Sequence, residues 1–459
     1  MPRHRPLLIL NVVGLSRGLV GADTPNIAAL AGRTALHRIE PMLPAVTCAV
    51  QSTYLTGLAP RDHGIVGNGW FDRALSEVHF WKQSSHLVQG ERVWETARAR
   101  DGAITSANCF WWYAMYGSSD VTVTPRPMYP ADGRKIPDIW THPPELRDSL
   151  QSELGPFPLF KFWGPAAAIE SSAWIAEAAL RVRSRSAPTL TFVYLPHLDY
   201  PLQKLGPEHP EIADELRAVD ALAGRLIEAY ESDGGRVIVL SEYGIESVTE
   251  PIPINRVLRD AGLLALREER GRELLDCGAS RAFAVVDHQV AHVYVRDPVD
   301  CPRVRELCQR TPGVELVLDV EGQAAMGVDH PRSGELVLVA AAGAWFSYGW
   351  WLEPRRAPDY ARTVDIHRKP GYDPCELFLD PALPLVEARV AWALFKRRLG
   401  FRSLIKVIPL DDHLVRGSHG RVSDDPDLDP ILIAPTLHKN GVLAATDVRD
   451  VILSELFAP

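Results

Sequence analysis

Short apolar runs alternate along the chain with stretches that have the periodicity of amphipathic helices. Three of these runs lack polar alternation: Leu7 to Val13, Leu190 to Leu195 and Arg236 to Leu240. Unbroken apolar runs are typical of parallel strands covered on both faces. Pro25 to Ala35 and Ile212 to Ser232 have helical patterns between them. This order predicts an α/β protein with a mostly parallel sheet, which binds ligands beyond the C-terminal ends of its strands.

The pattern changes after the third strand, from about Pro251 to Ala342. A small α+β insert is expected there, with helix, strand, helix and strand at 253–268, 290–295, 301–309 and 314–318. Residues 1–250 and 343–459 would then form the α/β core. Residues 70–165 of that core are loop-rich and aromatic, and we expect this segment to lie near the substrate.

Composition narrows the possible partners. A net charge of -9 argues against a surface for nucleic acid polymers, because binding them needs clustered basic residues. No apolar run reaches the roughly 18 residues of a membrane span, so no membrane partner is expected. The 6 cysteines form no C-x-x-C pair, and we expect a cytoplasmic protein.

Thr47 and Asn68 are the first candidate functional residues, in the segment Leu43 to Asp72. Thr47 follows a proline and precedes a helical run, so its hydroxyl is expected at a helix N-terminus, where the dipole favours an anion. A plain N-cap threonine is the competing interpretation. Asn68 lies between two glycines and could point its amide at a phosphoryl oxygen, or could simply be a turn residue.

Polar residues follow the two later strands and also occur near the C-terminus. Asp199 follows the strand that ends at Leu195, and Glu242 follows the strand that ends at Leu240. His419 lies between small residues, where a ligand can approach closely. Carboxylate and imidazole are suitable ligands for zinc or manganese. A helix cap for Asp199 and a solvated loop for His419 are the simpler alternatives.

The order of these segments resembles the alkaline phosphatase superfamily, within it the type I phosphodiesterase/nucleotide pyrophosphatase family. The matching pieces are Val13-Gly14-Leu15, Thr47, His63-Gly64-Ile65 with Asn68, Asp199 with Gln203, Ser241-Glu242-Tyr243-Gly244 and His419-Gly420. The resemblance implies a three-layer α/β/α core and a site with two divalent ions, usually zinc. It also implies that Thr47 is the nucleophile, that Asn68 binds a phosphoryl oxygen, and that Asp199 and His419 bind metal.

The departures from the family pattern fall at metal-ligand positions. Val13 stands where the family has an aspartate, and Asn11 is the nearest polar residue on that strand face. Gln203, Glu242 and Tyr243 stand where the family has histidine, aspartate and histidine. We therefore expect one or two ions, zinc or manganese, with weakened affinity. Asp199, His419 and Glu242 would be the main ligands, supplemented by the oxygen donors of Asn11, Gln203 and Tyr243.

Further residues could contact a substrate. Trp70 and Trp111 belong to aromatic groups that could stack on a flat leaving group, although such rings more often pack the core. Arg368 lies beside a Pro-Gly turn and could bind an anion, although a structural turn is the simpler reading. His288 and His292 are spare donors in an apparent strand.

Three hypotheses follow. The first is an intracellular, metal-assisted hydrolase that acts on a small phosphate or phosphonate ester, or an anhydride, through Thr47. The second is a member of the fold that has lost catalysis and serves as a binding or regulatory protein. The third is a single-metal enzyme of different chemistry, such as phosphonate hydrolysis or biosynthetic group transfer.

Overall fold

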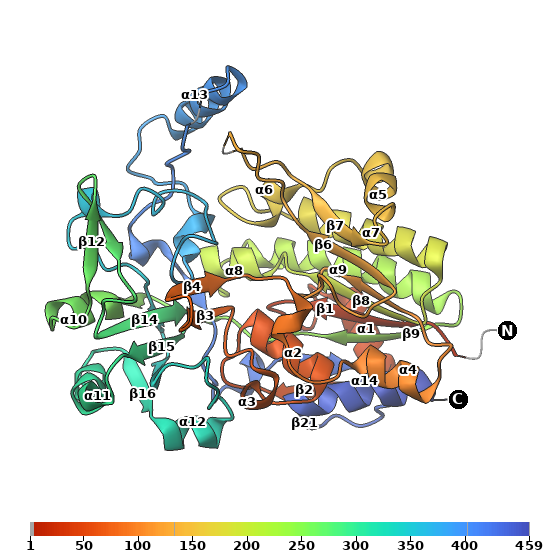
Figure 1. Cartoon of the computed structure of the whole chain (residues 1–459). Helices are drawn as coiled ribbons and strands as arrows, with labels where there is room; N and C mark the ends of the chain where they lie inside the picture. Colours follow the sequence, from red (N-terminus) through yellow and green to blue (C-terminus); the bar gives the residue numbers. More distant parts are fainter. Residues whose placement is uncertain (1–3, 133, 402, 459) are drawn as a thin grey trace.

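A mixed sheet forms the centre of the computed structural model, which describes residues 4–132, 134–401 and 403–458 (Figure 1). Nine strands of this described part pair in the order β21-β2-β20-β9-β1-β8-β5-β6-β7. Their bounds are β1 (Leu7–Val12), β2 (Leu36–Glu40), β5 (Ser106–Cys109), β6 (Val121–Pro125), β7 (Ile139–His142), β8 (Leu190–Leu195), β9 (Arg236–Leu240), β20 (Ile431–Ile433) and β21 (Val442–Ala444).

The three strands expected from the sequence lie side by side at the centre of this sheet. β1 pairs in parallel with β8 on one side and with β9 on the other. Val12 is opposite Leu195, and Asn11 is opposite Leu240. The loops that follow β1, β8 and β9 therefore leave the sheet at one edge, as the predicted parallel arrangement requires.

Helices cover both faces of the sheet and complete the predicted three-layer core. One layer contains α1 (Pro25–Arg33), α7 (Glu170–Ser186) and α9 (Ile212–Glu231), which pack on one another and on β1, β8 and β9. The opposite layer contains α2 (Thr47–Thr56), α4 (Val93–Arg100) and α14 (Val448–Phe457) (Figure 1). The apolar strands between them are fully buried, because both faces are covered.

A second apolar core lies beside the main one and includes most of the expected insert. Its antiparallel sheet has the order β14-β15-β17-β16. Its elements are α10 (Ile254–Asp260), β14 (Ala282–Asp287), β15 (Val290–Val295), α11 (Cys301–Gln309), β16 (Val314–Leu318), α12 (Val320–Met326) and β17 (Leu336–Ala340). This core continues past residue 342 as far as Tyr372.

The expected helix at 253–268 is shorter, because Gly262 takes a left-handed φ of 70° that ends it. The hairpin of β12 (Leu266–Glu269) and β13 (Arg272–Leu275) follows.

Residues 70–165 contain more regular structure than their loop-rich composition indicates. The segment supplies β5, β6 and β7 of the main sheet, together with α4 and α5 (Leu146–Leu154). A hairpin of β3 (Gly69–Asp72) and β4 (Glu77–Phe80) precedes them. These strands have four or five residues each, which is too short for a periodic pattern to be recognised.

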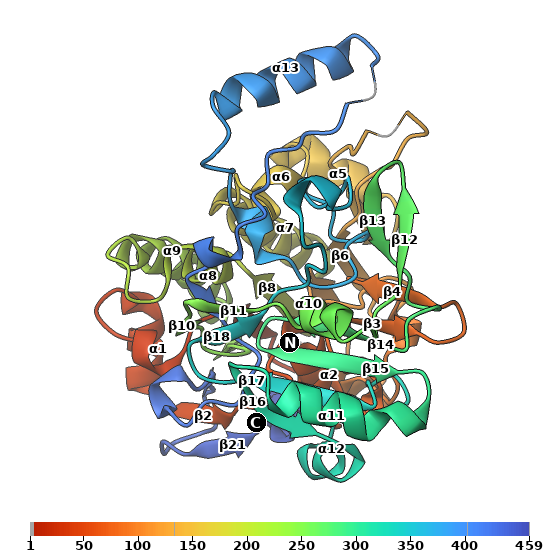
Figure 2. The same cartoon turned by 90° about the vertical axis from the view of Figure 1, so that its left-hand side faces the viewer.

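α13 (Val386–Arg398) projects from the body of the protein, at the end of an extended connection (Figures 1 and 2). The remaining helices and strands are α3 (Pro60–His63), α6 (Leu159–Phe162), α8 (Asp199–Leu205), β10 (Glu246–Ser247), β11 (Glu250–Ile252), β18 (Ala344–Phe346) and β19 (Gly417–Ser418). Among the described residues, we find no helix with the length and apolar character needed to cross a bilayer.

Candidate active site

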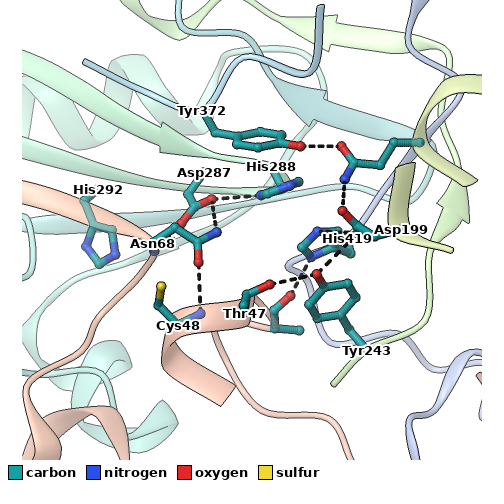
Figure 3. Close-up of polar contacts among 12 residues, drawn as sticks. Thr47, Cys48, Asn68, Asp199, Tyr243, Asp287, His288, His292, Tyr372 and His419 are labelled. Atoms are coloured by element: carbon teal, nitrogen blue, oxygen red, sulfur yellow. Dashed lines mark hydrogen bonds and ion pairs between the residues drawn. The ribbon is translucent and has the colours of Figure 1, made fainter. Parts of the chain in front are cut away.

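Thr47 is the first residue of α2, at the edge where the central strands end. Its side chain is 4% exposed, and its Oγ1 lies 2.9 Å from the hydroxyl oxygen of Tyr243 (Figure 3). Val46 takes an extended conformation and is the N-cap, so Thr47 itself does not cap the helix through its side chain. The hydroxyl therefore lies at the positive end of the helix dipole, where negative charge is stabilised.

Tyr243 connects Thr47 to Asp199. Its hydroxyl donates to Asp199 Oδ1 at 3.3 Å. Since a tyrosine has one hydroxyl proton, the 2.9 Å contact then has Thr47 as its donor. The three groups form a directed chain from the threonine hydroxyl to a buried carboxylate.

Gln203 and Tyr372 hold the other side of Asp199. Gln203 lies one turn after Asp199 in α8, and its Nε2 donates to Asp199 Oδ2 at 2.8 Å. Tyr372 then donates its hydroxyl proton to Gln203 Oε1 at 2.7 Å. The amide of Gln203 is thus satisfied at both ends by protein groups.

Glu242 occupies the position behind Thr47. Its Oε1 accepts from Asn11 Nδ2 at 2.5 Å and from Gln51 Nε2 at 2.7 Å. Gln51 lies one turn after Thr47 on α2, so both side chains point to the same side of the helix. Complete burial raises the pKa of Glu242 to about 8, against the opposing effect of these hydrogen bonds. Glu242 is therefore mainly protonated at neutral pH.

His419 lies flat against Tyr243. The two rings stack with centroids 3.6 Å apart, and His419 Nδ1 lies 2.7 Å from the carbonyl oxygen of Ala45. That contact requires the proton on Nδ1, so Nε2 is the free lone pair and lies 3.7 Å from Asp199 Oδ1. Burial lowers the pKa of His419 well below its usual value, and the imidazole is neutral.

Asn68 and Asp287 form the third side of the site. Asn68 Oδ1 accepts from the backbone N–H of Cys48 at 2.9 Å, at the start of α2. Asn68 donates its backbone N–H and its Nδ2 to Asp287, at 2.7 and 3.1 Å. His288 Nδ1 lies 2.8 Å from the same carboxyl group, in a turn where His288 takes a left-handed φ of 60°. Burial raises the pKa of Asp287 to about 6.

The carboxyl groups of Glu242 and Asp199 are not fully ionised near neutral pH. Burial raises the pKa of Asp199 to about 7, against hydrogen bonds from Gln203 and Tyr243. Burial also raises the pKa of Tyr243 well above its usual value. Asp199 is therefore half protonated at pH 7, and it can accept or release a proton without a large change in free energy.

The donor set does not fit a two-zinc site. Among the described residues there is no group of three or more His, Cys, Asp or Glu side chains placed to hold an ion. Asp199 and His419 retain the ligand types of the family, whereas Gln203 and Tyr243 hydrogen-bond to protein groups. Val13 is a buried apolar residue. Because zinc sites in proteins use at least three good protein ligands, the two-zinc centre that the resemblance implies is not supported.

The predicted substrate residues are dispersed. Trp70 packs in a small apolar cluster with Cys48, and the guanidinium of Arg332 lies 4.7 Å from its ring centroid. Trp111 is fully buried in the main core, 5.5 Å from the ring of Phe192, so the prediction that it contacts substrate is not supported. Arg368 is largely exposed, and its guanidinium lies 3.7 Å from Asp365.

Two other buried histidines, His197 and His292, also contact protein groups. His197 Nε2 lies 2.5 Å from Glu215, facing α9 rather than Thr47. His292 Nε2 lies 2.9 Å from the carbonyl oxygen of Val66.

Three members of the cluster were missed by sequence reasoning: Gln51, Asp287 and Tyr372. Gln51 could have been found, because it is four residues after Thr47 in an expected helix. Asp287 ends β14, a strand that was not predicted, so its position at the end of a strand was not expected. Tyr372 follows the Pro-Gly turn, where no helix or strand pattern indicates its direction.

The space beside the cluster is small. A recess of ≈ 20 Å³ borders Ala45, Tyr243 and His419. That volume is close to the space one water molecule needs.

The chain belongs to the type I phosphodiesterase / nucleotide pyrophosphatase family, which matches residues 7–373. An uncharacterised pyrophosphatase/phosphodiesterase of Schizosaccharomyces pombe is 24% identical over 279 residues, covering 58% of this chain and 49% of that protein. Ectonucleotide pyrophosphatase/phosphodiesterase family member 1 of Mus musculus is 24% identical over 237 residues, covering 50% of this chain and 22% of that protein. The chain thus spans about half or less of the length of these relatives.

Solved structures confirm the fold. Murine ectonucleotide pyrophosphatase/phosphodiesterase 5, as an inactive variant in complex with AMP, superposes with a TM-score of 0.60 at 14% identity. The match covers 99% of this chain and 95% of that one. The human protein of the same name gives a TM-score of 0.57, also at 14% identity. The predicted alkaline phosphatase-like architecture is therefore confirmed.

Proposed function

We propose that this chain cleaves a small phosphoric ester, with Thr47 Oγ1 as the attacking oxygen. The observation that carries the proposal is the directed hydrogen-bond chain from Thr47 through Tyr243 to Asp199. A hydroxyl is a weak nucleophile until a base takes its proton. With a pKa of about 7, Asp199 is suited to accept that proton through the Tyr243 hydroxyl.

The proposed reaction has two halves. Thr47 Oγ1 forms a bond to phosphorus as the ester oxygen leaves, and the threonine proton moves to Tyr243 while the Tyr243 proton moves to Asp199. The released ester oxygen takes a proton from solvent. Water then attacks phospho-Thr47 and gives one proton to solvent, the bond from phosphorus to Thr47 Oγ1 breaks, and the proton on Asp199 returns through Tyr243 to Thr47 Oγ1. The N-terminus of α2 supports negative charge on the phosphoryl oxygens in both halves.

Metal use is the part of the family's chemistry that this donor set supports least. Asp199, Gln203 and Tyr243, at the family's ligand positions, bond to one another, whereas His419 Nε2 and Glu242 Oε2 have no hydrogen-bond partner among the described residues. We therefore propose that hydrogen bonds between protein groups take the place of a two-zinc centre. A reducing, cytoplasmic compartment also remains a proposal, in keeping with the six free cysteines.

Initial rates on p-nitrophenyl phosphate, bis-p-nitrophenyl phosphate and an aryl phosphonate test the role of Thr47. We expect Thr47→Ala to abolish turnover. Ser52→Ala is the matched control, because Ser52 lies on the same helix and its buried hydroxyl bonds only to the carbonyl oxygen of Cys48. Equal rates for Thr47→Ala and the parent protein would refute Thr47 as the nucleophile.

A binding protein without turnover is the second candidate. It is favoured by the residues at the family's metal-ligand positions, where Val13, Gln203 and Tyr243 replace aspartate and histidine. On this alternative, AMP or inorganic phosphate would bind measurably by calorimetry while no ester in the panel is cleaved. Turnover that Thr47→Ala abolishes would exclude it.

A further inference from the structure

α13 and the connection after it present an unusual concentration of exposed apolar side chains. Trp392 is 59% exposed, Phe395 is 50% exposed and Leu399 is 59% exposed. Further exposed members of the same segment are Leu385, Leu394, Phe401 and Leu404. In both views α13 projects from the body of the protein (Figures 1 and 2). Exposed apolar surface of this extent marks an interaction site.

Three of the exposed apolar side chains form one face of the helix, and Leu394 lies off that face. Trp392, Phe395 and Leu399 follow one another at spacings of three and four residues, so they share a face, and the Trp392 and Phe395 rings lie 5.6 Å apart. Val390 packs instead toward the body, and Ala393 is buried. The exposed face is therefore separate from the side that holds the helix on the protein.

Basic residues border this apolar face on both sides. At 100° per residue, Arg389 and Lys396 fall on one flank and Arg398 on the other. Lys396 Nζ lies 5.9 Å from the centroid of the Trp392 ring. None of these three cations lies within ion-pair distance of a carboxylate in the part of the chain that the structure describes. Their charges are therefore available to a partner.

The charge of the segment opposes that of the whole chain. Residues 386–406 contain six Lys or Arg and a single Glu, a net charge of +5, whereas the whole chain carries -9. A helix with an apolar face that contains Trp, Phe and Leu, bordered by Lys and Arg, has the composition of helices that lie in a membrane interface. Anionic lipid headgroups complement such a charge.

We propose that α13 attaches this protein to an anionic phospholipid surface. The helix lies parallel to the bilayer, with Trp392, Phe395 and Leu399 below the headgroups and the flanking cations among the phosphates. A second copy of the chain is the less favoured occupant, because two such segments would each bring a charge of +5 to the contact. The inference goes beyond the proposed reaction and replaces the expectation of no membrane partner, since attachment needs no membrane span.

Co-sedimentation of the full chain with vesicles tests the proposal. We expect binding to phosphatidylcholine vesicles that contain phosphatidylglycerol, much weaker binding to pure phosphatidylcholine, and loss of binding at high salt. Arg389→Gln/Lys396→Gln/Arg398→Gln should weaken binding about 100-fold, since each cation near an anionic surface contributes roughly a fivefold factor. Trp392→Ser/Phe395→Ser/Leu399→Ser should abolish binding without lowering the melting temperature, because these side chains are exposed.

Arg267→Gln/Arg310→Gln/Arg355→Gln is the matched control. It removes the same charge from exposed residues elsewhere, each of which is ion-paired with a glutamate. We expect this variant to bind vesicles like the parent chain. No binding to either vesicle, or equal loss in the control, would overturn the proposal. A dimer in solution that the triple serine variant dissociates would overturn it in favour of a second copy.

Discussion

Tyr243 stands where the family has a metal-binding histidine, and its hydroxyl now joins Thr47 to Asp199. We expect Tyr243→Phe to lower kcat/KM for a cleaved ester by about 100-fold or more, since the variant breaks the route of the proton. The melting temperature should fall only slightly, because the ring and its stack on His419 remain. A steady-state assay with a thermal melt would check both expectations. Unchanged kcat/KM would refute the proton route.

Glu242 gives the protein a stability that depends on pH. Its pKa in the folded protein, about 8, lies above the ordinary value of 4.5. The folded state therefore binds more protons between these values, and the free energy of unfolding falls as pH rises through this window. Glu242→Gln keeps an oxygen that accepts from Asn11 and Gln51 but cannot ionise.

The Glu242→Gln variant should therefore lose much of this pH dependence. Near pH 5 we expect it to match the parent, and by pH 9 to be more stable by roughly a few kcal/mol. Urea unfolding at a series of pH values measures the difference. Parallel curves for the two proteins would show that Glu242 is ionised in the folded state.

The hairpin of β14 and β15 supports the site at the scale of elements, because Asp287 at the end of β14 receives two hydrogen bonds from Asn68. We expect Asp287→Ala to lower the free energy of unfolding by about 2–4 kcal/mol, since buried donors lose their acceptor. Asp214→Ala, at an exposed position of α9, is the control and should change it by less than about 0.5 kcal/mol. Equal effects would contradict a supporting role for Asp287.

The sequence predicted the long elements well. β8, β9, β15, α11 and β16 have the expected bounds, because apolar runs and helical periodicity are strong signals over five residues or more. β5 and β7 were missed, because four residues that include Ser, Asn and Thr carry little pattern. The helix expected at 253–268 was too long, since a single Gly262 ends it where pattern alone continues.

At the scale of the whole molecule, the order of motifs along the chain predicted the fold, and the family match and the solved structures confirm it. Motif order could also bring Thr47, Asp199, Glu242 and His419 together. Asp199 and Glu242 follow strands that lie side by side, Thr47 begins a helix at the same edge, and His419 was placed there by the resemblance to the family. It could not show that Gln203 and Tyr243 bond to protein groups. Such pairings depend on side-chain directions that only the folded chain defines.

Metal content per chain tests most directly whether hydrogen bonds between protein groups have replaced the family's two-zinc centre. The measurement is elemental analysis after equilibrium dialysis against zinc. The comparison protein is the variant Val13→Asp/Gln203→His/Glu242→Asp/Tyr243→His, which restores the family's ligand types. We expect the parent chain to retain no stoichiometric zinc, and the variant to gain it. One or two tightly bound ions in the parent chain would contradict the metal-free site.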